Sequence, residues 1–128
     1  MTTKSKSKVG KNKATCVVFA KLPKDIQNYV VKPEGDDTLV LKYTFKLGKQ
    51  FRTNDGFAWN AKIKLGNKIV CEVYNRGDGG SNLYTPVSKP LFKTLEQDAE
   101  VVYPDAYEAL DCFLGFVDIT TQLKINTK

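Results

Sequence analysis

The stretch Phe57–Val73, with the sequence FAWNAKIKLGNKIVCEV, decides the fold of this chain. Its first half places apolar side chains at every second position, which is the period of a half-buried β-strand. Glycine and asparagine follow at 66 and 67, a pair that is typical of tight turns. A second apolar run comes directly after them. We therefore predict an antiparallel hairpin with one buried face and one face that carries lysines.

The length of the turn determines which side chains of the second strand face the core. A two-residue loop would pair Leu65 with Lys68 and would turn the apolar residues of the second strand outward. A three-residue loop over 65–67 keeps them on the core side, and the expected pairs are then Ile63–Ile69, Ala61–Cys71 and Trp59–Val73. Because a one-residue slip inverts every side chain, we predict the longer loop, with a bulge and with Asn67 near the left-handed region.

Further strands are expected on both sides of this hairpin. Residues Thr38–Leu47 alternate in the same way, and the turn residues 54–56 separate them from the hairpin. A β-branched and aromatic run at 15–20 predicts a short first strand, and 83–87 predicts a short last one. Residues 22–37 contain two prolines, a glycine and two adjacent aspartates, so they predict an irregular connection.

Two helices are expected after the last strand. Ser88 is a favourable N-cap with Pro90 in the first turn, and apolar residues then recur at helical spacing: Leu91, Phe92, Leu95 and Ala99. Asp105 and Glu108 stand three positions apart, which resembles a capping box before a second apolar stripe. Strands followed by helices predict an α+β fold, in which an antiparallel sheet of about four strands has two C-terminal helices packed on one face.

The composition excludes several classes of protein. The chain has 128 residues, enough for one domain with its own core, and we assign that single α+β domain to residues 14–128. The absence of histidine excludes Ser-His and Cys-His catalysis and histidine-based zinc sites. Cys16, Cys71 and Cys112 are far apart, so we expect buried free thiols, no metal site and no cofactor. No run of about 18 apolar residues is present, and the lysine-rich N-terminus does not resemble a secretory signal. We therefore expect a cytoplasmic protein that is not an enzyme and does not enter the membrane.

The charge of the chain is unevenly distributed. The formal net charge is +6, and five positive charges lie within residues 1–13, on Lys4, Lys6, Lys8, Lys11 and Lys13. We predict that residues 1–13 form a flexible basic arm. Residues Thr94–Leu123 contain seven acidic side chains and no basic one. Opposite charges on two regions suggest partner surfaces, and two ordinary solvated faces produce the same pattern. We expect three of the acidic residues to lie on a solvated helix face and not to form a catalytic pair: Glu108, Asp111 and Asp118.

The polar face of the predicted sheet carries a row of four lysines: Lys42, Lys46, Lys62 and Lys64. Such a row can contact phosphates without reading sequence, although a solvated sheet face also carries lysines. The aromatic residues of the same strands share the apolar phase, so we expect them in the core: Tyr43, Phe45, Phe57 and Trp59. An aromatic surface on which bases stack is therefore not predicted.

A glycine-rich loop, Asn75–Tyr84 (NRGDGGSNLY), follows the hairpin. Its spacing matches neither a Walker A motif nor a Rossmann fingerprint, and it has too few acidic residues for an EF-hand. Two interpretations remain open. One is a structural turn, and the other is a small anion or partner site formed by backbone N–H groups and by the residues Asn75, Arg76, Gly79, Gly80, Asn82 and Tyr84.

The loop and the turn before it resemble a pattern found in small proteins of phages and bacterial mobile elements. In that pattern a GxxV-like turn precedes an N-D-G-x-G-G-x-N-x-Y-like loop and a C-terminal acidic helix. The matching residues are Gly66, Val70, Asn75, Gly77, Gly79, Gly80, Asn82 and Tyr84, with Arg76 in place of the first acidic residue. The resemblance covers less than half of the chain. It implies a phage-type origin and a role in binding host machinery, and it implies no particular chemistry.

Two hypotheses of function follow. The first is a non-enzymatic accessory protein in the cytoplasm of a bacterial host, which binds a host protein complex or nucleic acid through the basic arm and the lysine row. Inhibition of a bacterial defence system is one form of this hypothesis. The alternative is a small-ligand module that binds a nucleotide or phosphate at the glycine-rich loop. The oligomeric state does not follow from the sequence.

Overall fold

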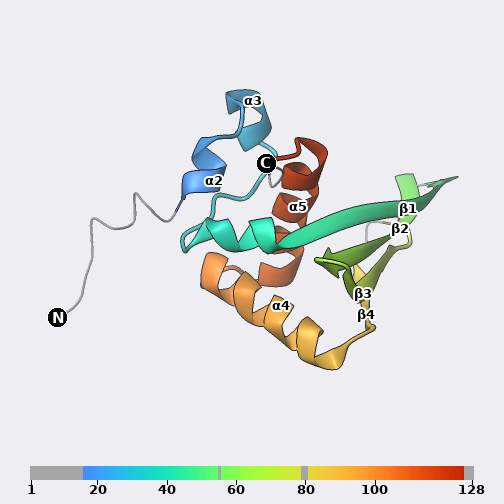
Figure 1. Cartoon of the computed structure of the whole chain (residues 1–128). Coiled ribbons are helices and arrows are strands. Elements are labelled where there is room, and N and C mark those ends of the chain that lie inside the picture. Colours follow the sequence, from blue (N-terminus) through green and yellow to red (C-terminus); the bar gives the residue numbers. More distant parts are fainter. Residues whose placement is uncertain (1–15, 55, 79–80, 126–128) are drawn as a thin grey trace.

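The computed structural model describes residues 16–54, 56–78 and 81–125. Its sheet has the order β1-β2-β3-β4, and each neighbouring pair is antiparallel. The strands are β1 (Tyr43–Thr53), β2 (Gly56–Leu65), β3 (Lys68–Asn75) and β4 (Leu83–Pro86). The two long helices, α4 (Lys89–Val102) and α5 (Ala109–Gln122), pack against the sheet, and the far end of the β1–β2 hairpin extends beyond them (Figure 1). The predicted α+β fold is confirmed.

The core lies between the inner face of the sheet and the two long helices. The Tyr43 ring meets the Phe113 ring edge to face, with the ring centroids 5.6 Å apart. Ile63 from β2 and Leu95 from α4 are fully buried in the same cluster. Edge-to-face pairs stabilise a core by about 1 kcal/mol beyond the area that they bury. These contacts fix which face of the sheet is covered by helices.

The predicted first strand at 15–20 is wrong. This segment contains instead a short helix, α2 (Val17–Ala20), followed by α3 (Lys24–Gln27). Asp37 is buried, and its carboxylate accepts hydrogen bonds from the backbone N–H groups of Val18 (3.1 Å) and Phe19 (2.7 Å). Burial raises the pKa of Asp37, and these hydrogen bonds oppose that rise. A distant carboxylate thus satisfies the N–H groups of the first helical turn and overrides the β propensity of the segment.

The predicted strand at Thr38–Leu47 is correct only in its second half. Its first half is a 3₁₀ helix, η1 (Asp37–Lys42), and β1 begins at Tyr43. The Asp36 side chain accepts a hydrogen bond from the Thr38 N–H and so supports the first turn of η1. Tyr43 and Phe45 face the core as expected, whereas Leu47 is 48% exposed.

The register of the β2–β3 hairpin differs from the prediction. Leu65 pairs with Lys68 across a two-residue loop in which Gly66, and not Asn67, has a positive φ of 63°. The extra residue lies in β3, where Val70 forms a bulge between the pairs Lys64–Ile69 and Ile63–Cys71. This bulge returns the rest of β3 to the core side, since Cys71 and Val73 are buried. Burial of the apolar residues therefore sets the register, as expected from the sequence. The extra residue that this register requires is a bulge in β3 and not a third residue in the loop.

Helix α4 begins as predicted, and α5 does not. The Ser88 hydroxyl accepts a hydrogen bond from the Leu91 N–H at 3.4 Å, and Pro90 lies in the first turn of α4. Glu108 is the N-cap residue of α5, so the predicted Asp105–Glu108 capping box is wrong. The Glu108 side chain interacts with Asp111 instead of with the backbone of the first turn. In the described part of the chain, no helix has the length and apolar character needed to cross a lipid bilayer.

The three cysteines form no disulfide in the described structure, and their environments differ. Cys71 is buried in the sheet, and burial raises the pKa of its thiol to about 12. Cys16 and Cys112 are only partly buried, so the expectation of buried thiols is correct for Cys71 alone. A thiol with such a raised pKa is not a nucleophile at neutral pH.

Candidate functional site

The outer face of the sheet is the side opposite the long helices. Residues that pair across antiparallel strands point to the same side of a sheet. The pairs Phe45–Ile63 and Ala61–Val73 point into the core, so the alternate pairs point outward. The outer face therefore consists of Thr44, Lys46, Asn60, Lys62, Lys64, Ile69, Glu72, Tyr74 and Thr85. It contains three of the four lysines of the predicted row.

Two of these lysines lie directly opposite each other. Lys46 of β1 pairs with Lys62 of β2, and Lys64 pairs with Thr44 one step along the same face. Like charges in direct opposition destabilise a sheet, by about 0.2–1 kcal/mol. The ion pairs that the described residues form are Lys42–Asp98 and Arg76–Asp78, so neither lysine has a bridging carboxylate. Glu72 of β3 lies opposite Lys62 on the other side, so the outer face carries three lysines and one carboxylate and keeps a net positive charge.

Two open hollows, of about 340 Å³ and about 360 Å³, lie side by side on the outer face. Both are lined by Asn60, Ala61 and Lys62 of the central strand β2. Glu72, Val73, Tyr74 and Thr85 complete the first hollow, and Lys46, Leu47, Gly48 and Lys49 complete the second. The surface therefore offers amide, hydroxyl and ammonium donors over all four strands of the sheet.

A bulge in β1 shapes the second hollow. The register of β1 against β2 shifts between Leu47 and Gln50. The Asn60 side chain lies over this irregularity, and its Oδ1 accepts a hydrogen bond from the Lys49 N–H at 3.0 Å. A Cβ at Gly48 would lie 2.0 Å from Asn60 Oδ1, so the position requires glycine as long as Asn60 keeps this orientation. Bulges of this kind frequently redirect side chains near functional sites.

The aromatic residues are distributed differently from the prediction. Tyr43 and Phe45 are buried and Trp59 is half-buried, but Phe57 is 53% exposed, so its predicted core position is wrong. Phe57 lies at the far end of the hairpin, where the Arg52 guanidinium is 5.3 Å from the centroid of its ring. Tyr74 lies on the outer face and is 42% exposed. One ring is therefore available beside the lysines, although the sequence pattern predicts none.

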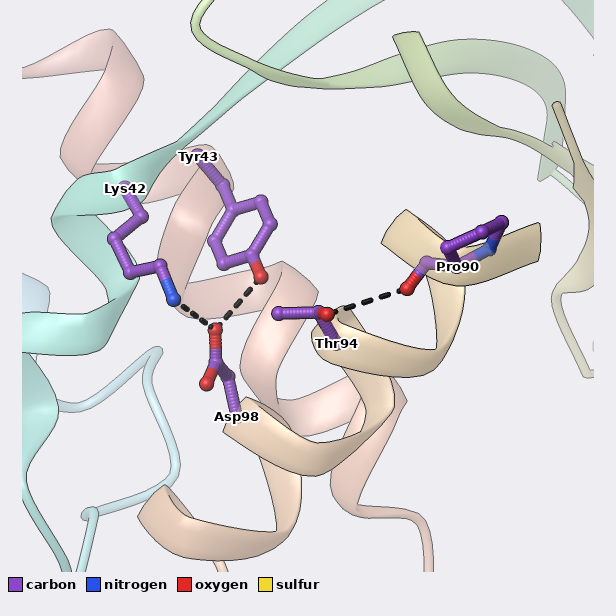
Figure 2. Close-up of polar contacts among 5 residues, drawn as sticks. All are labelled: Lys42, Tyr43, Pro90, Thr94 and Asp98. Atoms are coloured by element: carbon purple, nitrogen blue, oxygen red, sulfur yellow. Dashed lines mark hydrogen bonds and ion pairs between the residues drawn. The ribbon is translucent and has the colours of Figure 1, made fainter. Parts of the chain in front are cut away.

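Lys42 does not belong to the lysine row, and the prediction that it shares a face with Lys46 is wrong. It lies in η1, and its Nζ is 2.7 Å from Asp98 Oδ2 on α4 (Figure 2). The Tyr43 hydroxyl donates a hydrogen bond to the same oxygen, also at 2.7 Å. Burial, followed by this hydrogen bond, raises the pKa of Tyr43. One turn earlier on α4, the Thr94 hydroxyl donates to the Pro90 carbonyl at 3.2 Å (Figure 2). We call Lys42, Tyr43 and Asp98 the Asp98 cluster.

The glycine-rich loop is held by a chain of side-chain hydrogen bonds. Asn75 Oδ1 accepts from the Gly77 N–H, and Asn75 Nδ2 donates to Asn82 Oδ1, both at 2.8 Å. Asn82 Nδ2 in turn donates to Asp111 Oδ1 on α5 at 3.2 Å, and the Tyr84 hydroxyl donates to the same carboxylate oxygen. Burial, followed by this bond, raises the pKa of Tyr84. We call Asn82, Tyr84 and Asp111 the Asp111 cluster.

Gly77 shows why the loop needs its glycines. Its φ is 76°, and a Cβ would lie 2.6 Å from the backbone nitrogen of Ala58. The Gly77 carbonyl also accepts a hydrogen bond from the Thr53 hydroxyl at 3.0 Å. The loop is thus packed against the start of β2. These contacts favour the structural-turn interpretation for the described part of the loop.

Other residues predicted for the loop site lie outside these contacts. Arg76 is 60% exposed along its side chain, and its Nε is 3.5 Å from Asp78 Oδ2. Gly79 and Gly80 lie outside the described residues, as do the five lysines of the predicted arm: Lys4, Lys6, Lys8, Lys11 and Lys13. Sequence reasoning missed Asp111 as the anchor of the loop. The sequence places Asp111 on a predicted helix. That position does not show which strand or loop residues its side chain contacts.

The acidic residues gather on the helical side of the molecule. Glu96, Glu100, Glu108 and Asp111 line a hollow of about 260 Å³ together with Tyr84 and Tyr107. A hydrogen bond to Asp111, together with its negative charge, raises the pKa of Glu108. Among the described residues, no group of three or more carboxylates or thiols is arranged to hold a metal ion. Asp111 and Asp118 are half-buried, which differs from the solvated positions expected for them, whereas Glu108 is exposed.

The chain matches no family model, and no curated protein sequence or solved structure is significantly similar to it.

Proposed function

We propose that this protein binds the phosphate backbone of nucleic acid through the outer face of its sheet. In this proposal Lys46, Lys62 and Lys64 contact phosphates, and the basic residues 1–13 add affinity that does not depend on sequence. The resemblance of the loop to phage proteins suggests a bacterial host cell as the setting, with interference in host defence as the biological role. No chemical step is proposed.

The single observation that carries the proposal is the direct opposition of Lys46 and Lys62. Their register places two ammonium groups on neighbouring strands, and neither lysine forms an ion pair among the described residues. The one carboxylate of this face, Glu72, lies opposite Lys62 and leaves Lys46 without an opposite charge across the strand. An anion with regularly spaced charges relieves this repulsion when it binds, and a nucleic acid backbone is such an anion. The hollows beside the lysines add donors of other kinds, from the Asn60 amide and the Thr85 hydroxyl.

The distribution of charge over the fold supports the same orientation. Residues 43–75 contain six basic and two acidic side chains, whereas residues 89–122 contain two basic and seven acidic ones. A polyanion is attracted to the strands and repelled by the helices, because oppositely charged regions steer an approaching ligand. The sheet face is therefore the side on which a nucleic acid binds.

The glycine-rich loop supports a nucleotide site less well. An anion site there needs free backbone N–H groups, but the Gly77 N–H already donates to the Asn75 side chain. The Arg76 side chain lies beside Asp78, whose negative charge opposes an incoming phosphate. We therefore propose that the glycine-rich loop has a structural role and that the outer face of the sheet binds the ligand.

Binding is tested by fluorescence anisotropy of a labelled single strand and of its duplex over a range of salt concentrations. We expect the logarithm of the affinity to fall linearly with the logarithm of the salt concentration. In the double variant Lys46→Gln/Lys62→Gln, loss of two phosphate contacts lowers the magnitude of the slope by about 1.4 for the single strand and by about 1.8 for the duplex. Removal of residues 1–13 should eliminate most of the remaining affinity.

The matched control is Lys89→Gln/Lys93→Gln, which removes the same charge from exposed positions on α4. The control should keep both the slope and most of the affinity. Equal weakening in the two double variants would mean that only the net charge matters, and it would contradict a site on the sheet. If neither oligonucleotide binds, nucleic acid is excluded, and a pull-down from nuclease-treated bacterial lysate would then seek a host protein complex.

A further inference from the structure

A small hollow of about 120 Å³ lies between the inner side of the sheet and α5, away from the lysines of the outer face. It is lined by Phe45, Trp59, Val73, Asn82, Asp111, Leu114, Gly115 and Asp118. Pockets for drug-sized ligands have volumes of about 300–1,000 Å³, so this hollow has room for a single small functional group. We call it the α5 pocket.

The floor of the α5 pocket is aromatic. The rings of Phe45 and Trp59 have centroids 5.9 Å apart, and their planes are inclined by 53°. Trp59 is half-buried because it pairs with Asn75 near the end of the region of the sheet that the helices cover. The face of an indole ring carries partial negative charge and attracts cations more strongly than the other aromatic side chains do.

Two carboxylates stand on one face of α5 beside this floor. Asp111 and Asp118 are seven positions apart, which is about two turns of helix and places them on the same side. Asp111 is oriented by Asn82 and Tyr84, and Asp118 Oδ1 accepts a hydrogen bond from Gln122 Nε2 at 2.9 Å. Among the described residues, neither carboxylate forms an ion pair.

Gly115 leaves the space between the carboxylates open. It follows Asp111 by four positions and precedes Asp118 by three, so it lies between them on the same helical face. A Cβ at Gly115 would meet no heavy atom within 4 Å, and the φ of this residue is not in the positive range. A glycine inside a helix makes the helix less stable than an alanine does. Neither packing nor backbone geometry requires glycine at position 115.

We infer that the α5 pocket binds an organic cation, with its ammonium or guanidinium group at Asp118, its alkyl chain against Phe45 and Trp59, and the charge of Asp111 at the other end of the pocket. Carboxylates supply charge-assisted hydrogen bonds, and the indole adds a cation–π contact. The acidic surroundings contributed by α4 and α5 raise the local concentration of cations. The cation is either a free amine or the end of a lysine or arginine side chain.

Trp59 provides the measurement, since it is the single tryptophan of the chain. We would titrate the protein at low salt with n-butylammonium, n-butylguanidinium and n-butanol, and would follow Trp59 emission and the NMR cross-peak of its indole N–H. Both cations should give saturable changes, and the neutral alcohol should give none. A parallel titration with blocked arginine and lysine tripeptides distinguishes the two sources, because tighter binding of the peptides indicates a side chain and tighter binding of the free cations indicates a small amine.

Three variants test the pocket. Gly115→Leu fills the space without a clash at Cβ, and Asp118→Asn removes one carboxylate charge; each should weaken binding about tenfold, the factor that corresponds to about 1.4 kcal/mol. The control Glu96→Gln removes the same charge from α4 outside the pocket and should change the affinity less than twofold, as expected for an exposed charge that makes no contact with the ligand. Far-UV circular dichroism checks that each variant is folded.

The inference is overturned if neither cation shifts the indole cross-peak of Trp59, or if n-butanol binds as tightly as n-butylammonium. It is also overturned if folded Gly115→Leu retains the affinity of the unmodified protein. A loss of equal size in Glu96→Gln would assign the effect to overall charge and would exclude a specific site at α5.

Discussion

The Asp98 cluster and the Asp111 cluster both contain a hydrogen bond from a tyrosine to an aspartate, but they differ in net charge. In each, a tyrosine of the sheet region donates its hydroxyl proton to an aspartate on one of the long helices. Asp98 also receives the ammonium group of Lys42, whereas the further groups described at Asp111 are the neutral amide of Asn82 and the carboxyl group of Glu108, and neither is a cation. One tyrosine–aspartate bond thus lies in a neutralised pair, and the other leaves a negative charge beside a hollow.

The difference shows which of the two clusters serves only the fold. A buried tyrosine hydroxyl needs an acceptor, and either carboxylate satisfies that need. Only the Asp98 cluster adds a cation, so the attachment of η1 to α4 is complete within the described residues. The Asp111 cluster holds the glycine-rich loop on α5 and keeps an uncompensated charge at the α5 pocket. This charge is the feature on which the proposed cation site at α5 depends.

The largest effect is expected from breaking the loop that supplies Asn82. Gly77→Ala places a methyl group against the backbone of Phe57 and Ala58 and forces a positive φ on alanine. We expect the free energy of unfolding to fall by about 3 kcal/mol, as measured by urea denaturation. Gly66→Ala is the matched control, because its φ is also positive but its Cβ would meet no atom within 4 Å. A loss of about 1 kcal/mol is expected there. Equal losses in the two variants would show that the packing of Gly77 on β2 contributes nothing.

A pair of isosteric changes compares the two clusters directly. Asp98→Asn keeps an acceptor for Tyr43 but removes the ion pair with Lys42, so we expect a loss of stability of about 1 kcal/mol. Asp111→Asn keeps an acceptor for Tyr84 and removes a charge that no described cation balances. Its free energy of unfolding should be unchanged or higher. Urea denaturation of both variants in one buffer measures the difference, and a greater loss in Asp111→Asn would reverse the comparison.

The smallest effect concerns the pH dependence of stability. Because Asp111 raises the pKa of Glu108 in the folded protein, the folded state retains this proton to a higher pH than the unfolded state does. Stability is therefore lost as the pH rises from the ordinary glutamate pKa through the raised one. Glu108→Gln removes this loss, so the Tm of the variant minus that of the unmodified protein should increase between about pH 4 and about pH 7 at low salt.

The control for that experiment is Glu96→Gln, which changes the same charge on α4. Asp37 also has a raised pKa, so part of the pH dependence should persist in every variant. If the Tm difference for Glu108→Gln is the same at every pH, the coupling of Glu108 to Asp111 is absent in solution.

Much of the fold could be predicted because local signals and burial agree there. The hairpin, the short last strand and the N-terminus of α4 follow from alternation and from capping by Ser88. The predictions fail where a distant group decides the local structure. The Asp37 carboxylate turns 17–20 into a helix, and neither its position nor its burial can be read from that segment. Val70 absorbs the extra residue of β3. The apolar pattern shows that one residue is extra, but not whether it lies in the turn or in the strand.

The candidate sites were predictable to different degrees. Alternation places Lys46, Lys62 and Lys64 on one face, and the structure has them there. The sequence could not predict which way the Lys42 side chain points. Its direction depends on the residue at which η1 ends and β1 begins. The α5 pocket combines residues from three strands, a loop and a helix. Such a site appears only when the sheet and α5 are brought together.

The bulge at Val70 also constrains the order in which the protein folds. Its carbonyl accepts hydrogen bonds from the N–H groups of Val87 (3.0 Å) and Ser88 (3.2 Å), the residues that lead into α4. A chain that first closes the hairpin in the alternative three-residue register lacks this bulge and therefore lacks the anchor for α4. We therefore expect correct pairing of β2 with β3 to precede the docking of α4.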